Sequence, residues 1–441
     1  MDFKEYPSYK DSGVEWLGKI PEHWEQKPIW SMFTRTKRTN HPNELLLSVY
    51  RDYGVIPKNS RNDNHNRASE DLTPYQLVLP NDLVINKMKA WQGSIAISEY
   101  KGIVSPAYYI YEPKQSYCSK YIHHLIRSVY FIQSYKNFSK GIRVNQWDLE
   151  HDAFTHINLL VPPLTEQNHI ISFLDSETSR IDNLITKQEK LIETLEKHRK
   201  SVISHAVTKG LDSNVPMKDS GVEWLGEVPE HWKILQTRHL FNFGKGLTIT
   251  KEDLSDEGIP CINYGEIHSK YGFEFNPLDN PLKCVSHDFI ESNKNCLLNE
   301  GDFIFADTSE DLEGSGNFSY LNQTSTVFAG YHTIIARPKS GLNHRYLAYM
   351  FDSQAYRSQV RTEMKGVKVY SVSQGVLKSR LAWLPSIKEQ VEIVKLLDEK
   401  SSKIDTLIAK QRELITKLKS YRTSIISHAV TGKIDVRDLV A

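Results

Sequence analysis

The chain has 441 residues, of which 39% are hydrophobic and 25% charged, and its 55 Lys and Arg nearly balance its 54 Asp and Glu. This composition excludes a disordered chain, and the length predicts several domains because a single core rarely grows so large. The first residues lack the apolar stretch of a secretory signal, the apolar runs are too short to span a bilayer, and the four cysteines contain no C-x-x-C pair. We therefore expect a soluble, cytoplasmic protein without a zinc site or a disulfide framework.

The chain contains an internal duplication. Residues 10–24 read KDSGVEWLGKIPEHW and residues 218–232 read KDSGVEWLGEVPEHW, which differ at two positions. A second pair of similar segments begins with Glu-Gln at residues 166 and 389 and runs through SHAVT in each copy. The first pair is offset by 208 residues and the second by 223. Because drift alone would not spare the ends and scramble the middles, we interpret the repeats as a scaffold that holds two different modules.

The middle of each half has the pattern of a mixed α/β domain. Apolar runs bounded by Gly, Pro, Asn or Asp predict strands, and a longer stretch near the end of each module predicts a helix. Residues 25–163 carry 17 Lys and Arg against 12 Asp and Glu, whereas residues 233–385 carry 16 against 17. The predicted strands are 45–50, 82–85, 94–97, 108–111, 301–305, 326–328 and 332–336, and the predicted helical stretches are 120–138 and 344–364.

A long helix follows each module. The segment that precedes each long helix ends at proline, at Pro162 and Pro163 in the first copy and at Pro385 in the second. Thr165 is the predicted N-cap of the first helix. A heptad of apolar residues predicts that the two helices bury one another in a coiled coil, although two separate surface helices would also fit the pattern. The heptad from 181 to 205 spans roughly 37 Å at about 1.5 Å per residue. The predicted seam residues are Ile181, Leu184, Gln188, Leu191, Leu195, Ile404, Leu407, Gln411, Leu414 and Leu418.

Basic and aromatic residues stand close together in both modules, as contacts to DNA phosphates and base edges require. Any one of them alone is more often an ordinary surface residue. Arg143 and Lys368 each follow a glycine in a turn that would suit a phosphate, although an ordinary loop fits equally well. The candidate DNA-binding residues are Arg51, Tyr53, Lys58, Arg61, Lys87, Lys89, Trp91, Arg143, Asn145, Lys245, Lys270, Tyr271, Lys365, Lys368 and Tyr370.

No catalytic motif stands out. The sequence lacks a P-loop, an H-E-x-x-H pair and the tetrad of an amino-group methyltransferase, and a lone Glu363-Met-Lys365 matches only part of a nuclease site. We therefore predict no catalytic residue, no metal and no cofactor in this chain. Two alternatives stay open: a nuclease or methyltransferase fused to recognition domains, and a scaffold that binds proteins without reading DNA.

The repeated SGVEWLG…PEHW segments and the paired helices from Glu-Gln to SHAVT resemble the specificity (S) subunit of type I restriction-modification systems over essentially the whole chain. Segments 102–106 and 258–262 add to the resemblance. It implies an α+β fold with a pseudo-two-fold repeat: target recognition domains at 1–163 and 217–385, and helical spacers at 164–216 and 386–441 that form an antiparallel coiled coil.

The resemblance also implies a function. Each domain would read one half of a bipartite, asymmetric site in double-stranded DNA, and the helices would set the spacer and dock two methyltransferase (M) subunits. Those partners would use S-adenosylmethionine to methylate adenine, and two optional restriction (R) subunits would use ATP and Mg. This chain would supply only the sequence recognition.

Overall fold

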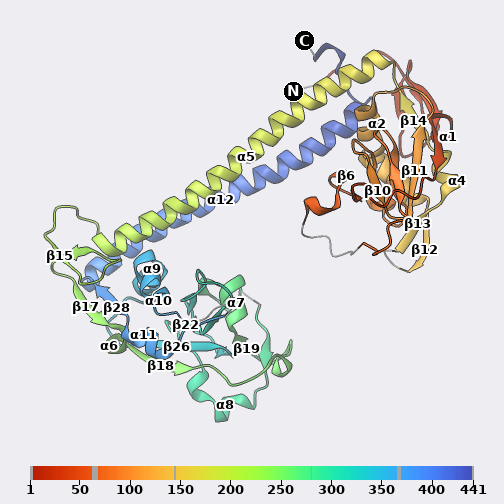
Figure 1. The fold of residues 1–441 in the computed structure, drawn as a ribbon. Coiled ribbons are helices and arrows are strands. Elements are labelled where there is room, and N and C mark those ends of the chain that lie inside the picture. Colours follow the sequence, from red (N-terminus) through yellow and green to blue (C-terminus); the bar gives the residue numbers. More distant parts are fainter. Residues whose placement is uncertain (1–2, 62–67, 144–145, 280, 365–368, 440–441) are drawn as a thin grey trace. The chain divides into compact units, whose positions relative to one another are not determined.

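The computed structural model describes residues 3–61, 68–143, 146–279, 281–364 and 369–439. The chain forms two compact units: unit 1 contains residues 1–189 and 412–441, and unit 2 contains residues 190–411. Each unit thus combines one module with parts of both long helices (Figure 1). Within the described residues, no helix has the length and apolar character that crossing a membrane requires.

Unit 1 is built on a four-stranded antiparallel sheet in the order β4-β11-β8-β9. Small hairpins and two-stranded pairs surround it. Its elements before the long helix are β1 (Tyr9–Asp11), β2 (Lys19–Pro21), β3 (Glu25–Pro28), α1 (Ile29–Met32), β4 (Phe33–Thr36), β5 (Leu47–Tyr50), β6 (Gly54–Pro57), β7 (Gln76–Val78), β8 (Leu83–Asn86), β9 (Ile95–Ile97), β10 (Gly102–Val104), β11 (Tyr108–Pro113), α2 (Ser119–Ile126), α3 (Val129–Asn137), β12 (Ser139–Arg143), β13 (Gln146–Leu149), α4 (His151–Thr155) and β14 (Asn158–Val161).

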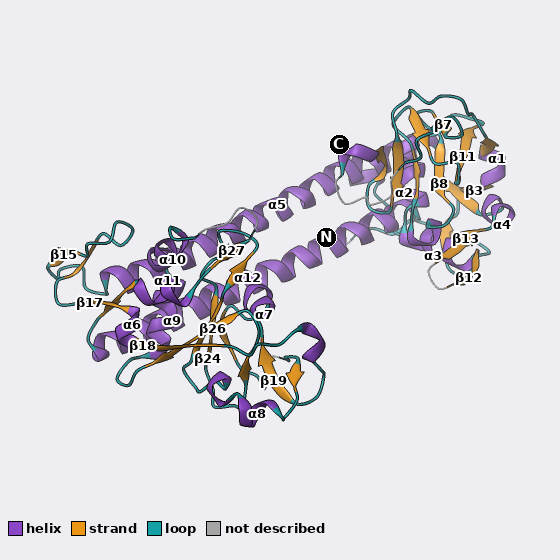
Figure 2. Ribbon diagram, turned by 60° about the horizontal axis from the view of Figure 1, so that its bottom comes forward, coloured by secondary structure: helices purple, strands orange, loops and turns teal. Residues whose placement is uncertain are grey.

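Unit 2 contains a sheet of the order β18-β26-β22-β24-β20, antiparallel except for its last pair. Figure 2 labels β18, β26 and β24 of this sheet. Its first four strands repeat the sheet of unit 1, so the different middles share one core architecture. The elements are β15 (Met217–Asp219), β16 (Glu227–Pro229), β17 (Lys233–Gln236), α6 (Thr237–Leu240), β18 (Phe241–Lys245), β19 (Ile259–Ile262), α7 (Tyr264–Ser269), β20 (Phe273–Phe275), β21 (Cys284–Val285), α8 (Phe289–Ser292), β22 (Phe303–Ala306), β23 (Thr308–Ser309), β24 (Phe318–Leu321), β25 (Phe328–Ala329), β26 (Thr333–Pro338), α9 (His344–Asp352), α10 (Gln354–Arg361), β27 (Tyr370–Ser371), α11 (Gln374–Ser379) and β28 (Leu381–Leu384).

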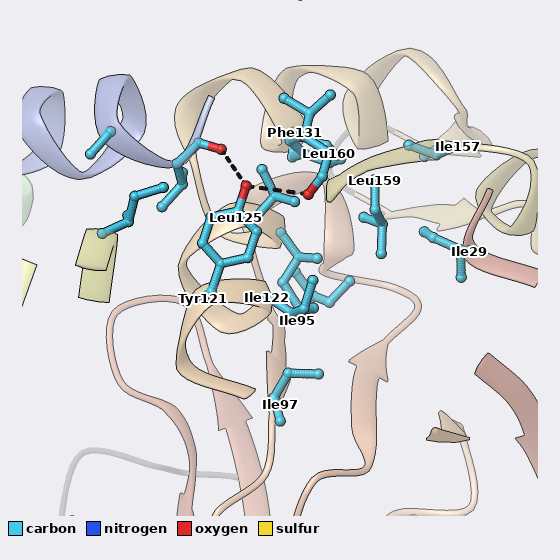
Figure 3. Packing of buried hydrophobic residues seen from close by; sticks show 14 of the residues in the cluster. Ile29, Ile95, Ile97, Tyr121, Ile122, Leu125, Phe131, Ile157, Leu159 and Leu160 are labelled. Atoms are coloured by element: carbon cyan, nitrogen blue, oxygen red, sulfur yellow. Dashed lines mark hydrogen bonds between the residues drawn. The ribbon is translucent and has the colours of Figure 1, made fainter. Parts of the chain in front are cut away.

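Helix α2 packs on the sheet of unit 1 through its apolar face. Ile122 and Leu125 lie in one buried cluster with Ile95 and Ile97 of β9, which Figure 3 shows from close by. The hydroxyl of Tyr121 donates to the carbonyls of Leu160 and Val430, so the helix is also tied to β14 and to the C-terminal helix. These contacts leave the opposite end of α2 next to the β5–β6 hairpin.

The predicted strands are confirmed to within a few residues, whereas each predicted helical stretch is divided in two. Residues 120–138 form α2 and α3, and residues 344–364 form α9 and α10. The break falls at Ser128 and at Ser353, whose backbones are extended. Ser353 caps the next helix, because its hydroxyl accepts a hydrogen bond from the amide of Tyr356.

Helices α5 (Leu164–Lys209) and α12 (Ile387–Val430) run antiparallel within each unit. Arg422 donates to Asp182 at 3.0 Å in unit 1, and Arg199 lies 3.5 Å from Asp405 in unit 2. The prediction that the two helices pack together is confirmed. The predicted N-cap is wrong, because α5 already begins at Leu164 and Thr165 lies in its first turn.

Seven of the ten predicted seam residues are buried or partly buried, and three are exposed. The a positions face inward: Ile181 and Ile404 are buried, and Gln188, Leu195, Gln411 and Leu418 are partly buried. Of the d positions, Leu184 is only partly buried and Leu191, Leu407 and Leu414 are 40–44% exposed. The inner positions beside the a residues are instead the next residues along the chain, at e: Ile185, Ile192, Ile408 and Ile415.

The repeated sequence motifs meet one another in each unit. In unit 1, the carboxylate of Glu166 accepts hydrogen bonds from Trp24 (2.9 Å) and Tyr6 (2.8 Å) and lies 2.7 Å from the His23 ring. In unit 2, Glu389 makes the corresponding contacts, at 2.9 Å each, with His231 and Trp232. We call this contact the Glu–Trp latch. It explains why P-E-H-W and Glu-Gln are repeated together.

The glutamine after each latch glutamate has its own repeated role. The side-chain amide of Gln167 donates to the Pro162 carbonyl and accepts from the Cys118 amide. Gln390 makes the same pair of bonds with the Pro385 carbonyl and the Asn343 amide. Each glutamine therefore fixes the start of a long helix against the chain that precedes the module's helix pair.

A lysine fixes the end of each long helix to the same place in the repeat. Lys209 donates to the carbonyl of Glu227, and Lys433 donates to the carbonyls of Leu17 and Lys19. Residues 19 and 227 are equivalent in the repeat. In unit 1, this contact and the pairing of Lys4 with Asp435 join the N-terminal segment to the C-terminal one.

Candidate nucleic-acid interface

A groove of about 770 Å³ opens beside the β5–β6 hairpin of unit 1. It gathers five of the predicted DNA-binding residues from separate parts of the sequence: Arg51, Tyr53, Lys58, Arg61 and Lys89. Four of the five are cationic. The rest of the lining is mostly polar or aromatic and includes Tyr50, Asp52, Tyr75, Asn86, Gln92, Ser94, Ser105 and Tyr108.

The hairpin presents its loop because β5 and β6 pair up to Tyr50 and Gly54, which leaves Arg51, Asp52 and Tyr53 between them. Gly54 has a φ of +73°, a conformation that glycine adopts without strain. A side chain there would also lie 3.0 Å from the ring of His123 and 3.2 Å from Ala96. The tight turn therefore requires glycine, and the turn places the loop residues at the groove.

The cations of the groove are held among aromatic rings and one carboxylate. The Arg61 guanidinium lies 4.4 Å from the ring centre of Tyr53 and 5.6 Å from that of Tyr50. Arg51 donates two hydrogen bonds to Asp52, at 2.9 and 3.1 Å. Arg51 lowers the pKa of the Asp52 carboxyl, and Arg61 contributes to this shift. The Asp52 carboxyl therefore stays ionised at neutral pH, and the four cations of the groove outnumber this one carboxylate.

Lys87 and Trp91 lie beside the β12–β13 hairpin and do not line the groove. Lys87 pairs with Asp148 at 2.8 Å, and the ring of Trp91 lies 4.9 Å from that of Trp147. Arg143 is the last residue of β12, although its side chain is outside the described part of the structure. Asn145, Lys365 and Lys368 also lie outside the described residues.

Unit 2 has a pocket of about 640 Å³ of the opposite character. The loop after β22 supplies most of its lining, and three of those side chains are carboxylates. None of the predicted DNA-binding residues lies in this loop, because the prediction relied on basic and aromatic residues and the loop is acidic. The lining residues are Tyr264, Gly265, His268, Thr308, Ser309, Glu310, Asp311, Glu313, Gly314, Asn317 and Val369.

A hydrogen-bond network fixes the wall of this pocket. The His268 ring lies 2.8 Å from the Thr308 carbonyl through Nε2 and 2.9 Å from the Asn317 amide through Nδ1. A carbonyl only accepts, so Nε2 carries the proton and Nδ1 accepts from Asn317. Arg357 then donates to Asn317 at 2.7 Å and to Asp352 at 2.9 Å.

The predicted residues of unit 2 are scattered. Tyr370 pairs with Ser309 of the pocket wall, so it lies close to the pocket. Lys245 ends β18 and Lys270 follows α7, and both are exposed outside the pocket lining. Tyr271 packs in a hydrophobic cluster and donates its hydroxyl to the Pro281 carbonyl, so its assignment to the DNA-binding set is wrong.

The two sites are built by equivalent loops. The β8–β9 loop lines the groove of unit 1, and the β22–β24 loop lines the pocket of unit 2. A turn with an aspartate precedes β8 in unit 1 and β22 in unit 2. Asp82 accepts from the Leu79 amide, and Asp302 accepts from the Asn299 amide. The aspartate shared by Asn81-Asp82 and Gly301-Asp302 is the feature of the sequence from which this equivalence could be found.

Among the described residues, no group of three or more His, Cys, Asp or Glu side chains could hold a metal ion. What both sites offer is hydrogen-bonding and charged side chains on loops that a rigid sheet supports. This arrangement suits recognition of a polar surface.

The family model described as "Type I restriction modification DNA specificity domain" matches residues 21–197 and 229–417. Two such matches, one in each repeat, define a protein with two DNA specificity domains. The chain belongs to the type I restriction-modification DNA specificity family.

Relatives and solved structures agree with this class. The chain is 22% identical to the type I restriction enzyme EcoKI specificity subunit of Escherichia coli, with 95% of this chain and 90% of the relative covered. It is 24% identical to the MjaVIII specificity subunit of Methanocaldococcus jannaschii, with coverages of 96% and 95%.

The fold is similar to that of the HsdS subunit from Thermoanaerobacter tengcongensis, with a TM-score of 0.53, 14% identity and coverages of 96% and 100%. A chain solved in work on complex assembly and conformational transition of the type I R-M system gives a TM-score of 0.67 at 14% identity, with coverages of 93% and 98%.

Proposed function

We propose that this chain is the DNA-recognition subunit of a type I restriction-modification complex and that each unit reads one half of a bipartite, asymmetric site. The observation that carries the proposal is the pair of specificity-domain matches, which fall on repeated ends around different middles. The groove of unit 1 supports it, because four cations and several aromatic rings lie together there. The complex would act in the cytoplasm, where the DNA is.

The partners in this proposal are two M subunits and, optionally, two R subunits. S-adenosylmethionine would bind to the M subunits, ATP and Mg to the R subunits, and none of them to this chain. In this proposal an M subunit docks on the long helices, where Leu191 and Leu407 of unit 2 are 41% and 44% exposed.

The test is to express the chain with its M subunits and to sequence the methylated adenines of the host genome. We expect one bipartite motif, and replacing residues 25–163 with the module of a relative should change one half-site only. Methylation or cleavage by the purified chain alone would indicate a fused enzyme instead. Assembly with M subunits but no methylated motif would indicate a scaffold.

Salt dependence tests the groove itself. If Lys58 and Lys89 contact phosphates, changing either one to Ala should weaken binding to all sequences and lower the salt slope by about one. Lys187, which is exposed on α5, provides the matched control, and its change to Ala should leave the slope unchanged. An unaltered slope in both groove variants would remove the groove from the interface.

A further inference from the structure

Helix α2 supports the recognition hairpin of unit 1 through one arginine. Arg127 lies at the C-terminal end of α2, and its guanidinium donates to the carbonyls of Ile95 (3.0 Å), Tyr50 (3.4 Å) and Arg51. Ile95 is in β9, whereas Tyr50 and Arg51 begin the loop of the β5–β6 hairpin. A single side chain therefore ties the loop to the central sheet.

The neighbouring packing leaves the loop little freedom. His123, one turn before Arg127 on α2, fills the space beneath Gly54 at the far end of the loop. At Gly93 a side chain would lie 2.9 Å from Ile132 of α3 and 3.6 Å from Arg51. The hairpin backbone thus sits on α2 at Gly54, and the β8–β9 loop sits on α3 at Gly93, beside the Arg51 side chain. Arg127 supplies polar contacts in that layer.

The contact is costly to lose. Burial lowers the pKa of the Arg127 guanidinium, and the Asp52 carboxylate opposes this shift. A guanidinium in such surroundings needs the carbonyls as acceptors, and the carbonyls in turn would lose their donor if the side chain were shortened. The arrangement uses backbone atoms of the loop, so it fixes the position of the loop and leaves its side chains available to a ligand.

We propose that Arg127 is a positioning residue for sequence readout by unit 1: it sets the conformation of the loop that carries Arg51, Asp52 and Tyr53. The inference rests on the proposed function of the chain. Paired hydrogen bonds from an arginine to a base edge depend on the orientation of the guanidinium. A shift of the loop would therefore reduce its discrimination between bases, although the charge of the loop would not change.

Arginines also hold a loop of the site in unit 2, although the loop is not the equivalent one. Helix α10 supplies Arg361, which donates to the Glu313 carbonyl at 2.5 Å, and Arg357, which donates to the Asn317 side chain at 2.7 Å. Both acceptors belong to the loop that lines the pocket of unit 2. In each unit, therefore, arginines from the helix pair hold a loop that lines the site, which is the β5–β6 loop in unit 1 and the β22–β24 loop in unit 2.

The experiment compares Arg127→Met and Arg127→Lys in the complete complex with M subunits. The readouts are the base frequencies at every position of the methylated motif and the melting temperature. We expect Met to reduce base preference about tenfold at positions of the half-site assigned to unit 1, while the other half-site stays strict. Lys should give an intermediate loss, because one ammonium reaches fewer of the three carbonyls.

Arg180→Met is the matched control, since Arg180 is exposed on α5 and pairs with Glu177 in the preceding turn of the same helix. It should change neither half-site. An unchanged motif in both Arg127 variants, whether or not melting or total methylation falls, would overturn the inference by leaving Arg127 a stability residue only. Absence of a bipartite motif in the unmodified complex would instead count against the proposed function. If Arg127→Met does not fold, the Lys variant alone decides.

Discussion

Glu166 and Glu389 occupy the same place in the repeat but differ in burial. The side chain of Glu166 is 6% exposed and accepts from Tyr6 and Trp24, with His23 beside it. That of Glu389 is 22% exposed and, among the described residues, hydrogen-bonds to the His231–Trp232 pair without a third donor. A buried donor that loses its acceptor costs more than an exposed one, so the two latches should differ in strength.

We expect Glu166→Ala to destabilise unit 1 by about 2–4 kcal/mol and Glu389→Ala to destabilise unit 2 by about 1–2 kcal/mol. Amide hydrogen exchange measured by mass spectrometry assigns each loss to its unit. Glu22→Ala is the control, because Glu22 belongs to the same motif and is exposed. Equal effects of both latch variants, or effects no larger than the control, would contradict the prediction.

Two adjacent histidines of α2 should make unit 1 sensitive to acid. Burial, with a contribution from Arg127, lowers the pKa of His123 to about 3, and burial lowers that of His124 to about 4. In the unfolded chain both pKa values are about 6.5. Between pH 6.5 and 4 the unfolded state therefore binds more protons, and the stability that is present above pH 6.5 is lost as the pH falls.

We expect the unfolding free energy of unit 1 to fall by about 2–4 kcal/mol between pH 7 and pH 5, with roughly half of the loss from each histidine. Replacing His124 with Leu should flatten this dependence, which urea denaturation at a series of pH values measures. His156→Gln provides a surface control, because His156 is exposed at the end of α4. A dependence on pH that is as steep in His124→Leu as in the unmodified chain would refute this explanation.

At the scale of elements, packing of the two long helices on each other determines which of two similar apolar residues is buried. The d and e positions are both apolar at Leu184-Ile185, Leu191-Ile192 and Leu407-Ile408. The structure buries the isoleucine and exposes the leucine at 407–408, where Leu407 is 44% and Ile408 is 7% exposed. Two adjacent residues of equal size therefore have opposite environments.

Ile408→Ala should cost about 2–4 kcal/mol, because it opens a cavity between the helices, whereas Leu407→Ala should cost less than about 1 kcal/mol. Thermal unfolding of the two variants gives the comparison. Leu407→Asp should in addition weaken association with the M subunit, which analytical gel filtration detects. A larger loss of stability from Leu407→Ala than from Ile408→Ala would show that the helices pack through the a and d positions after all.

At the scale of the whole molecule, the proposed function makes the long helices the element that sets the spacer between half-sites. Four residues inserted after Thr208 add about 6 Å if they are helical, which is close to two base pairs at about 3.4 Å each. We expect the methylated motif to keep both half-sites and to gain one or two base pairs of spacer. Some affinity should be lost, because a four-residue stutter locally unwinds a coiled coil.

Sequencing of methylated adenines reads the outcome directly. A seven-residue insertion at the same place is the matched control, because it keeps the heptad phase and should lengthen the spacer further. An unchanged spacer with full methylation would show that the helices do not set the distance. Altered half-site bases would show that the modules are not autonomous.

The sequence by itself determined the duplication, the long helices, the main strands and the family, because these follow from local periodicity and from near-identical segments. Only the tertiary structure decided which apolar stripe of each helix is buried, since Leu407 and Ile408 are equivalent in hydrophobicity and the partner helix makes the choice. It also decided that Arg51, Lys58, Arg61 and Lys89 share a groove while Tyr271 belongs to the core. The four groove residues lie on separate strands and loops, and the packing of the β5–β6 hairpin on α2 brings them together.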